Sequence, residues 1–280
     1  MKVGYASDIH IEFAPVEIYN TEKADVLILA GDIIVASRLY DRNEKHYLGD
    51  REFSVGSSDR FHLFFQQVCE EFKDVIFILG NHESYHFDIA ETYSYLKEKF
   101  SYLKNLHILE KEKLVLNDVT FLAGTMWTNF NNYDPIAMSY IQWRMNDFQI
   151  IKNSNRKQDL YLTSVWSPED AYKDHLEFMS FVNKELSDED VRKVVMVTHH
   201  CPSSVCVPEK YKGEVKMNPG YVSNLEDFIL DNPKITHWVC GHSHRRLDAM
   251  IGSTNLVMNC RGYFPMEETS QTFSLKYFDV

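Results

Sequence analysis

Five short apolar segments of this 280-residue chain each lead into a polar side chain of a kind that binds metal ions. The segments are rich in Val, Ile and Leu, and they cover residues 2–6, 25–30, 74–79, 193–197 and 237–240. Continuous apolar runs of this length predict strands that are buried on both faces of a sheet. The polar residues that follow them are Asp8 and His10, Asp32, Asn81 and His82, His199, and His242 and His244. Because ligands collect at the carboxyl ends of parallel strands, we expect these residues to lie together in one crevice.

Helical patterns alternate with the predicted strands. Apolar residues recur at helical spacing from 61 to 72, and a second helix is predicted from about 88 to 100. A third helix is predicted to begin after Ser167, because proline and then acidic residues follow this N-cap residue. Further strands are predicted near residues 106–109, 112–116, 119–123, 247–251, 255–258 and 272–278. This alternation predicts an α/β fold.

The length and composition favour one domain. A chain of 280 residues lies near the upper limit for a single hydrophobic core, and 44% hydrophobic with 25% charged residues is ordinary for a globular protein. We predict a single domain over residues 1–280, with cap-like insertions at about 34–59 and 124–166. Each is a polar or aromatic segment next to the predicted site, where loops often cover substrates.

Charge and cysteine content exclude several classes of partner and site. The net charge of −12 and the lack of a run of Lys and Arg argue against binding to long duplex nucleic acid. No segment approaches the roughly 20 apolar residues of a membrane span, and a strand at Lys2 leaves no room for a signal peptide, so we expect a cytoplasmic protein. The five cysteines lack C-x-x-C spacing, which predicts free and mostly buried thiols. The oligomeric state is not predictable from these features.

The polar residues after the strands have the chemistry of metal ligands. Asp8 and His10 are two residues apart, so both can face one ion, and Asp32 adds a carboxylate that can bridge two ions. Taken singly, Asp8, Asp32 and Asn81 could each be a cap or turn residue. Together they predict a site for two divalent ions. Oxygen and nitrogen ligands without thiolate favour Mn, Fe, Zn or Ni.

These motifs resemble the sequence blocks of the calcineurin-like metallophosphoesterases: D-x-H, G-D, G-N-H-[DE], H and G-H-x-H, from Asp8 to His244. The resemblance implies a four-layer α/β/β/α sandwich, with two mixed sheets flanked by helices. It implies that one ion is held by Asp8, His10, Asp32 and His244. It implies that the second is held by Asp32, Asn81, His199 and His242, with Asp32 as the bridge. In this family the first histidine of a pair such as His199 and His200 is the ligand.

A narrower resemblance covers nearly the whole chain. Uncharacterised bacterial and phage members of the superfamily are similar at residues 7–13, 125–130, 145–148, 198–203, 224–225 and 259–263, but they indicate no substrate. Glu83 is similar to the Ser/Thr phosphatase branch. However, residues 33–36 replace the D-R-G motif that gives those phosphatases a phosphate-binding arginine. We give more weight to this difference and to the paired histidines, which are typical of phosphodiesterases.

The predicted activity is that of a dinuclear metal-dependent phosphoesterase. Two divalent ions about 3.5–4 Å apart can share a hydroxide for in-line attack on phosphorus. His82 is the candidate to protonate the leaving oxygen or to donate a hydrogen bond to it, with a nearby carboxylate as its partner. The expected substrate is a nucleotide or another small phosphodiester. The alternatives are a phosphomonoesterase for nucleotides or proteins, and a non-catalytic scaffold with the same fold. Short RNA or DNA ends also stay open as substrates, because a cleft can admit a single strand without a basic exterior.

Several other residues allow two interpretations. Arg261 follows an apolar strand and is a candidate phosphate contact, with a surface salt bridge as the alternative. Trp127, Tyr133 and Trp143 could stack on a nucleobase, although an aromatic cluster belongs more often to a core. The lysines of the segment from 201 to 220 are expected to be solvated.

Overall fold

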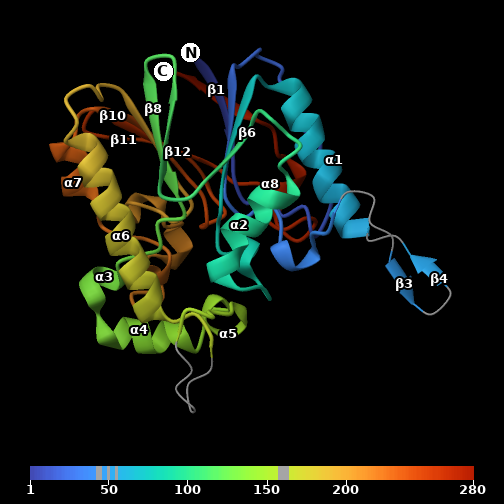
Figure 1. Cartoon of the computed structure of the whole chain (residues 1–280). Helices are drawn as coiled ribbons and strands as arrows, with labels where there is room; N and C mark the ends of the chain where they lie inside the picture. The colour runs from blue at the N-terminus through green and yellow to red at the C-terminus, as the bar shows by residue number, and fades with distance from the viewer. Residues whose placement is uncertain (42–45, 49–50, 54–55, 157–163) are drawn as a thin grey trace.

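The computed structural model describes residues 1–41, 46–48, 51–53, 56–156 and 164–280. Its first sheet has the strand order β13-β1-β2-β5-β6 (Figure 1). The strands are β1 (Lys2–Ala6), β2 (Val26–Ala30), β5 (Asp74–Ile78), β6 (Leu106–Leu109) and β13 (Lys276–Asp279). β1, β2, β5 and β6 run parallel, and β13 pairs antiparallel with β1.

The second sheet has the order β11-β12-β10-β9-β8-β7. Its strands are β7 (Glu112–Leu116), β8 (Val119–Gly124), β9 (Val194–Thr198), β10 (Ile235–Cys240), β11 (Arg246–Ile251) and β12 (Thr254–Asn259). β8, β9, β10 and β12 are parallel, whereas the edge strands β7 and β11 are antiparallel to their neighbours. Both sheets are therefore mixed. A separate hairpin pairs β3 (His46–Leu48) with β4 (Arg51–Phe53).

Helices cover the outer faces of both sheets (Figure 1). The helices and helical turns are α1 (Gly56–Glu71), α2 (Ile89–Lys99), α3 (Phe130–Tyr133), α4 (Pro135–Gln142), α5 (Asp147–Ile150), α6 (Pro168–Leu186), α7 (Glu226–Asp231) and α8 (Glu268–Gln271). Single 3-10 turns are η1 (Ala36–Arg38), η2 (His82–Ser84), η3 (Ser204–Cys206), η4 (Glu209–Tyr211) and η5 (Asn218–Gly220). The residues of α3 all have left-handed φ, so this element is a left-handed turn. None of the described helices is long and apolar enough to span a membrane.

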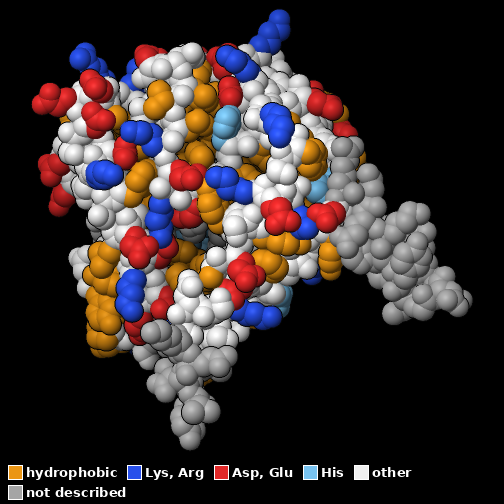
Figure 2. Space-filling view, viewed as in Figure 1, with side chains coloured by type: hydrophobic (Ala, Val, Ile, Leu, Met, Phe, Trp, Pro, Cys, Tyr) orange, Lys and Arg blue, Asp and Glu red, His pale blue; other side chains and the backbone are white. Residues whose placement is uncertain are grey.

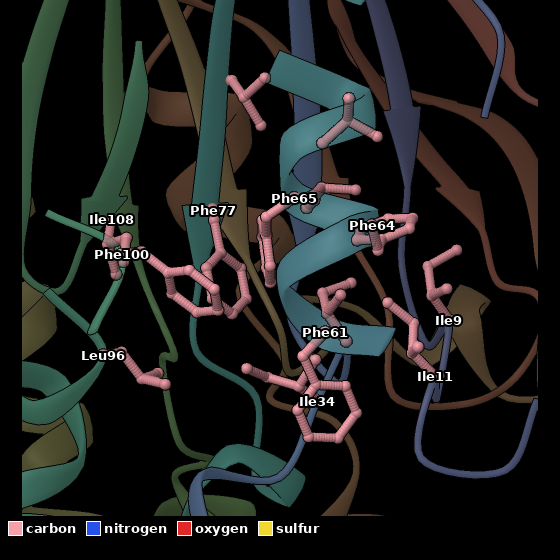
Figure 3. Close-up of a cluster of buried hydrophobic side chains, with 14 of the residues drawn as sticks. Ile9, Ile11, Ile34, Phe61, Phe64, Phe65, Phe77, Leu96, Phe100 and Ile108 are labelled. Atoms are coloured by element: carbon pink, nitrogen blue, oxygen red, sulfur yellow. The ribbon is translucent and has the colours of Figure 1, made fainter. Parts of the chain in front are cut away.

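The strands are apolar throughout because each sheet is covered on both faces. In β2, Val26 and Ile28 pack between the two sheets, whereas Leu27 and Leu29 pack in the cluster that includes α1. Figure 3 shows aromatic side chains of this outer cluster, including Phe65 of α1, near Phe77 of β5. A corresponding cluster joins α6 and α7 to the second sheet. The predicted four-layer α/β/β/α sandwich is therefore confirmed.

Most predicted elements agree with the structure to within a few residues. Ser167 caps α6 through a reciprocal capping box with Asp170, as its sequence pattern predicts. The strand predicted at 272–278 begins only at Lys276, because the chain beside it changes partners. Ser7, beyond the end of β1, forms an isolated bridge with Cys260, the residue after β12, and the carbonyl of Ser274 accepts a hydrogen bond from the Asn259 side chain.

The segments predicted as caps differ in what the structure describes of them. Residues 124–156 and 164–166 include α3, α4 and α5, and they form an apolar cluster of their own with Ala171 of α6. Part of the 34–59 segment lies outside the described residues, and so does 157–163. All five cysteines are free, and four of them are buried, as predicted.

Candidate metal centre and active-site cavity

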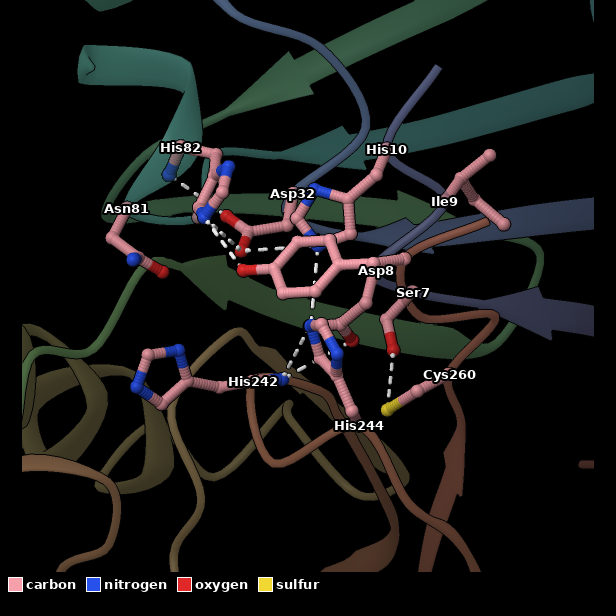
Figure 4. Close-up of polar contacts among 12 residues, drawn as sticks. Ser7, Asp8, Ile9, His10, Asp32, Asn81, His82, His242, His244 and Cys260 are labelled. Atoms are coloured by element: carbon pink, nitrogen blue, oxygen red, sulfur yellow. Dashed lines mark hydrogen bonds and ion pairs between the residues drawn. The ribbon is translucent and has the colours of Figure 1, made fainter. Parts of the chain in front are cut away.

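The structure brings all the predicted ligands and His82 to one edge of the two sheets. Asp8 and His10 follow β1, Asp32 follows β2, Asn81 and His82 follow β5, His199 follows β9, and His242 and His244 follow β10. These strands are parallel within each sheet, so their carboxyl ends deliver the side chains to a common place (Figure 4). The two sheets also touch here, because the backbone N–H of Ser7 donates to the carbonyl of Asn259 over 3.2 Å.

The first group of ligand atoms comprises Asp8, His10 and His244. The Nε2 atoms of His10 and His244 are 3.2 Å apart. Nε2 of His244 lies 3.4 Å from Oδ1 of Asp8, and Nε2 of His10 lies 3.8 Å from Oδ2 of Asp32. Four potential donor atoms therefore converge on one point.

The second group comprises Asp32, His199 and His242, with Asn81 beside them. Nε2 of His199 is 3.0 Å from Oδ1 of Asn81, 3.4 Å from Oδ1 of Asp32 and 3.2 Å from Nδ1 of His242. Asp32 therefore directs Oδ1 toward this group and Oδ2 toward the first. This is the geometry of a bridging carboxylate.

The hydrogen bonds of the histidines show that these groups suit cations. Nδ1 of His10 faces Glu12 over 3.0 Å, and Nδ1 of His244 faces Glu267 over 2.9 Å. Both acceptors are carboxylates, so each Nδ1 carries the proton and donates it. In the neutral rings the two facing Nε2 atoms then both present lone pairs, which repel each other at 3.2 Å unless a positive charge lies between them. A carboxylate behind the ligating histidine is the usual support in metal sites.

His199 shows the same arrangement. Its Nδ1 donates to the carbonyl of Ala30 over 2.9 Å, which leaves Nε2 free to bind beside Nδ1 of His242. The residues present therefore fit a pair of divalent cations.

The backbone at the site is strained. Asp8, His10, Asp32, His242 and His244 all have φ between 48° and 67°, a region that residues other than glycine rarely adopt. Such strain is characteristic of functional sites.

Two glycines make the close approach of these turns possible. A Cβ on Gly80 would collide with the Asp32 carboxylate, and one on Gly241 would lie 2.5 Å from Oδ2 of Asp8. Neither position therefore tolerates a side chain.

Glu83 joins the two loops that carry Asp32 and Asn81. Its carboxylate accepts hydrogen bonds from the backbone N–H groups of Gly80, Asp32, Ile33 and Ile34, over 2.7 to 3.2 Å. Burial and the nearby Asp32 raise the pKa of Glu83 to about 7, although the backbone donors oppose this shift. Glu83 thus positions the loops rather than facing the cavity.

The carboxylates create a negative potential that stabilises positive charge. Burial lowers the pKa of His199, but Asp32 and Asp8 outweigh it and raise the value to about 10. Burial also lowers the pKa of His82, but the negative charges of Asp32 and Glu12 outweigh it and raise the pKa to about 9. A site that favours protonated imidazole in this way also attracts divalent cations.

His82 lies beside the ligands with its own partners. Its Nδ1 faces Glu12 over 3.3 Å, its Nε2 is 3.2 Å from the hydroxyl of Tyr263, and its ring stacks on Tyr85 at 4.1 Å. Glu12 thus contacts both His10 and His82. The predicted carboxylate partner of His82 is present in the structure.

Three supporting carboxylates had no role in the sequence-based prediction. Glu12 belongs to the similar segment 7–13, and Asp147 to the similar segment 145–148, so their motifs were visible although their function was not. Asp147 accepts hydrogen bonds from Asn81 over 2.7 Å and from Tyr85 over 2.9 Å. Glu267 lies in no motif and could be found only from the fold.

Arg261 does not join the site. It is 4% exposed and donates to the carbonyls of Ile9, Ala14 and Pro15 over 2.9 to 3.3 Å, so its guanidinium holds the loop after β1. The interpretation as a surface salt bridge is wrong, because the side chain is buried on backbone carbonyls. The predicted phosphate contact stays a prediction that these bonds do not support.

The remaining aromatic and histidine candidates divide between core and surface. Trp127 is buried, whereas Tyr133 is 47% and Trp143 is 76% exposed. His200 is buried, and burial followed by repulsion from His199 lowers its pKa to about 3, so this ring is neutral. The predicted aromatic cluster is therefore not a single unit.

A cavity of about 540 Å³ opens in front of the ligand groups. It is lined by the segment 144–147 and by residues of the segment 207–221: Val207, Pro208, Tyr211, Glu214, Met217, Asn218 and Tyr221. The lining also includes Asp32, Asn81, His82, His242 and His244 of the candidate centre, together with Tyr263. A cavity of this size suits a nucleotide-sized ligand.

This fold and site define a metal-dependent phosphoester hydrolase. The chain belongs to the calcineurin-like phosphoesterase family, whose model matches residues 1–246. Members of this family bind divalent metals in a dinuclear site.

Two similar proteins illustrate the range of the match. An uncharacterised protein, L509, of Acanthamoeba polyphaga mimivirus is 24% identical over 212 residues, which are 71% of this chain and 72% of that protein. The crystal structure of the phosphopantetheinyl hydrolase of Mycobacterium tuberculosis has a TM-score of 0.67 at 15% identity and covers 99% of this chain and 95% of that one. At this identity the structural likeness supports the shared fold only.

Proposed function

We propose that this protein is a dinuclear phosphodiesterase that acts on a nucleotide or another small phosphodiester. Asp8, His10, Asp32 and His244 would hold one divalent ion, and Asp32, Asn81, His199 and His242 would hold the other. The observation that carries this proposal is the convergence of carboxylate oxygens and histidine nitrogens in two adjacent groups, with Asp32 directing one oxygen toward each group. Manganese, iron, zinc and nickel all suit such a ligand set.

The chain's own residues supply proton transfer and positioning. When bound, two divalent ions lower the pKa of a water and neutralise charge on a phosphoryl group. His82 keeps its proton because Asp32 and Glu12 stabilise the imidazolium, and its side chain lines the cavity with Nε2 3.2 Å from the hydroxyl of Tyr263. From there it can protonate the leaving oxygen, a role typically worth about 10²- to 10⁴-fold in rate. Glu12 fixes the ring through Nδ1.

The charge of the cavity favours a diester over a monoester. Among the described residues that line it, Arg144 is the one lysine or arginine. Arg261 is committed to backbone carbonyls and lies outside the lining. A phosphate monoester carries about one more negative charge than a diester, and this cavity offers little to neutralise it beyond the metal centre.

The proposal is tested with bis-p-nitrophenyl phosphate and p-nitrophenyl phosphate, each with Mn, Ni, Zn or Fe. We expect the diester to give the higher kcat/KM. A clear preference for the monoester would replace the proposal with a phosphomonoesterase, and no hydrolysis under any metal would support a non-catalytic scaffold.

Two variants separate metal binding from proton transfer. The His82→Ala protein should retain both metal equivalents but lose most turnover, whereas Asp32→Asn should lose stable binding of both ions, as measured by elemental analysis. Normal diester turnover by His82→Ala would remove this residue from the mechanism.

A further inference from the structure

An open hollow adjoins the active-site cavity. Its volume is about 530 Å³, and Arg144 lines both spaces. The hollow is otherwise lined by Pro135, Ile136, Ser139, Tyr140, Trp143 and Lys216. It therefore continues the cavity outward, over α4 and toward the loop that carries Lys216.

The hollow exposes aromatic and apolar surface to solvent. Trp143 is 76% exposed, whereas Trp127, Trp166 and Trp238 are buried. Ile136 is 67% exposed. Figure 2 shows hydrophobic side chains gathered over the region of α3 and α4. A flat, uncovered indole beside an active site is a typical surface for stacking of a planar ligand.

Two cations accompany this aromatic surface. The guanidinium of Arg144 lies 4.5 Å from the centre of the Tyr140 ring, and the ammonium of Lys216 lies 5.6 Å from it. Within the described part of the chain, neither cation forms an ion pair with a carboxylate. On a protein of net charge −12, this is a local basic site that is free to bind an anion.

We propose that this hollow is a subsite for single-stranded nucleic acid, in which a nucleobase stacks on Trp143 and two neighbouring phosphates lie against Arg144 and Lys216, one at each cation. The inference rests on the proposed phosphodiesterase function and names its substrate class as a short oligonucleotide. Aromatic rings alternating with cations are the usual means of binding single strands. The acidic exterior beyond the hollow disfavours a long duplex, which would extend over it.

The subsite is tested first by binding, without turnover. The anisotropy of a fluorescein-labelled thymidine octanucleotide is measured with protein freed of metal by chelation. Trp143→Ala should raise the Kd at least about fivefold, and Trp143→Phe should retain most of the affinity because it keeps an aromatic ring. Leu63→Ala is the matched control, because Leu63 is a 64% exposed apolar residue on α1 that lines neither the active-site cavity nor the hollow. Its Kd should equal that of the unmodified protein.

The salt dependence tests the two cations. Neutralising two phosphates on a single strand predicts a slope of log K against log salt of about −1.4, since each contact contributes about −0.7. Lys216→Gln should reduce the slope to about −0.7. A slope near zero, or an equal effect of Leu63→Ala, would overturn the subsite. Preferential binding of anionic lipid vesicles over the oligonucleotide would also overturn it.

Turnover then separates this inference from the proposed function. In Trp143→Ala, kcat/KM for the oligonucleotide divided by that for bis-p-nitrophenyl phosphate should fall at least about fivefold. If neither compound is hydrolysed but binding depends on Trp143, the subsite stands and the proposed activity fails. If the diester is hydrolysed but the ratio is unchanged, the activity stands and the subsite fails.

Discussion

Glu12 allows a sharp test of how the metal centre and the proton donor depend on each other. One oxygen of its carboxylate contacts His10 over 3.0 Å and His82 over 3.3 Å. Glu12→Gln keeps the shape but replaces two charge-assisted hydrogen bonds with neutral ones, at about 1 kcal/mol each. The loss at His10 predicts about a fivefold weaker Mn affinity, which is below the 10- to 100-fold usual for removal of such supporting residues because Gln keeps a neutral hydrogen bond. The loss at His82 predicts about a fivefold lower kcat.

The assay is calorimetric titration of Mn into chelated protein, followed by kcat for bis-p-nitrophenyl phosphate at saturating Mn. Glu267→Gln is the comparison, because Glu267 contacts His244 over 2.9 Å and its side chain is 33% exposed. That variant should weaken Mn binding with little effect on kcat at saturation. If Glu12→Gln changes neither quantity, or affects affinity alone as Glu267→Gln does, the proposed link from Glu12 to His82 is refuted.

Three further predictions concern a glycine at the site, the effect of Mn on stability and the pH dependence of stability. Gly80→Ala should abolish stable metal binding, measured by elemental analysis, because its methyl group would collide with Asp32, whereas Gly56→Ala, with open space at Cβ, should not. Mn at about 100 times its Kd should raise the Tm by about 5 °C relative to chelated protein, from about 2.7 kcal/mol of linkage; a Tm indifferent to Mn would contradict the metal site. Burial lowers the pKa of His175 to about 4, so its stabilising contribution is complete above pH 6.5 and is lost as the pH falls toward 4. In urea unfolding of chelated protein, the free energy of unfolding should fall between pH 6.5 and pH 5 by about 2 kcal/mol more in the unmodified protein than in His175→Gln. Equal decreases in the two proteins would contradict this assignment.

The sequence predicts the metal centre well because the strand pattern and the ligand pattern coincide. A buried parallel strand requires a continuous apolar run, so the end of each run is visible, and the residue after it is placed by the sheet. Asp8, Asp32 and His199 were located in this way although they are far apart in the chain. The order of the strands in each sheet was not predictable, because it depends on contacts between distant segments.

The supporting residues were harder to predict. Glu12 and Glu267 resemble ordinary surface acids in the sequence, and only the fold shows that they face histidine rings. Trp127 and Trp143 lie in the same aromatic segment, yet one belongs to a core and the other is open to solvent. Their positions depend on which side of an irregular segment faces the sandwich, and no regular periodicity encodes that choice.

The meeting of the two sheets at the candidate centre has a consequence for the cohesion of the whole molecule. Asp8, Asp32 and Asn81 extend from the first sheet, and His199 and His242 from the second. On the proposed assignment, the two cations would link the two sheets, which otherwise contact each other mainly through apolar packing. Removal of the cations should therefore allow the two sheets to separate more often, while the hydrogen bonds within each sheet remain. Amide hydrogen exchange would then quicken first along the seam between β1 and β12, and last in the middle of either sheet.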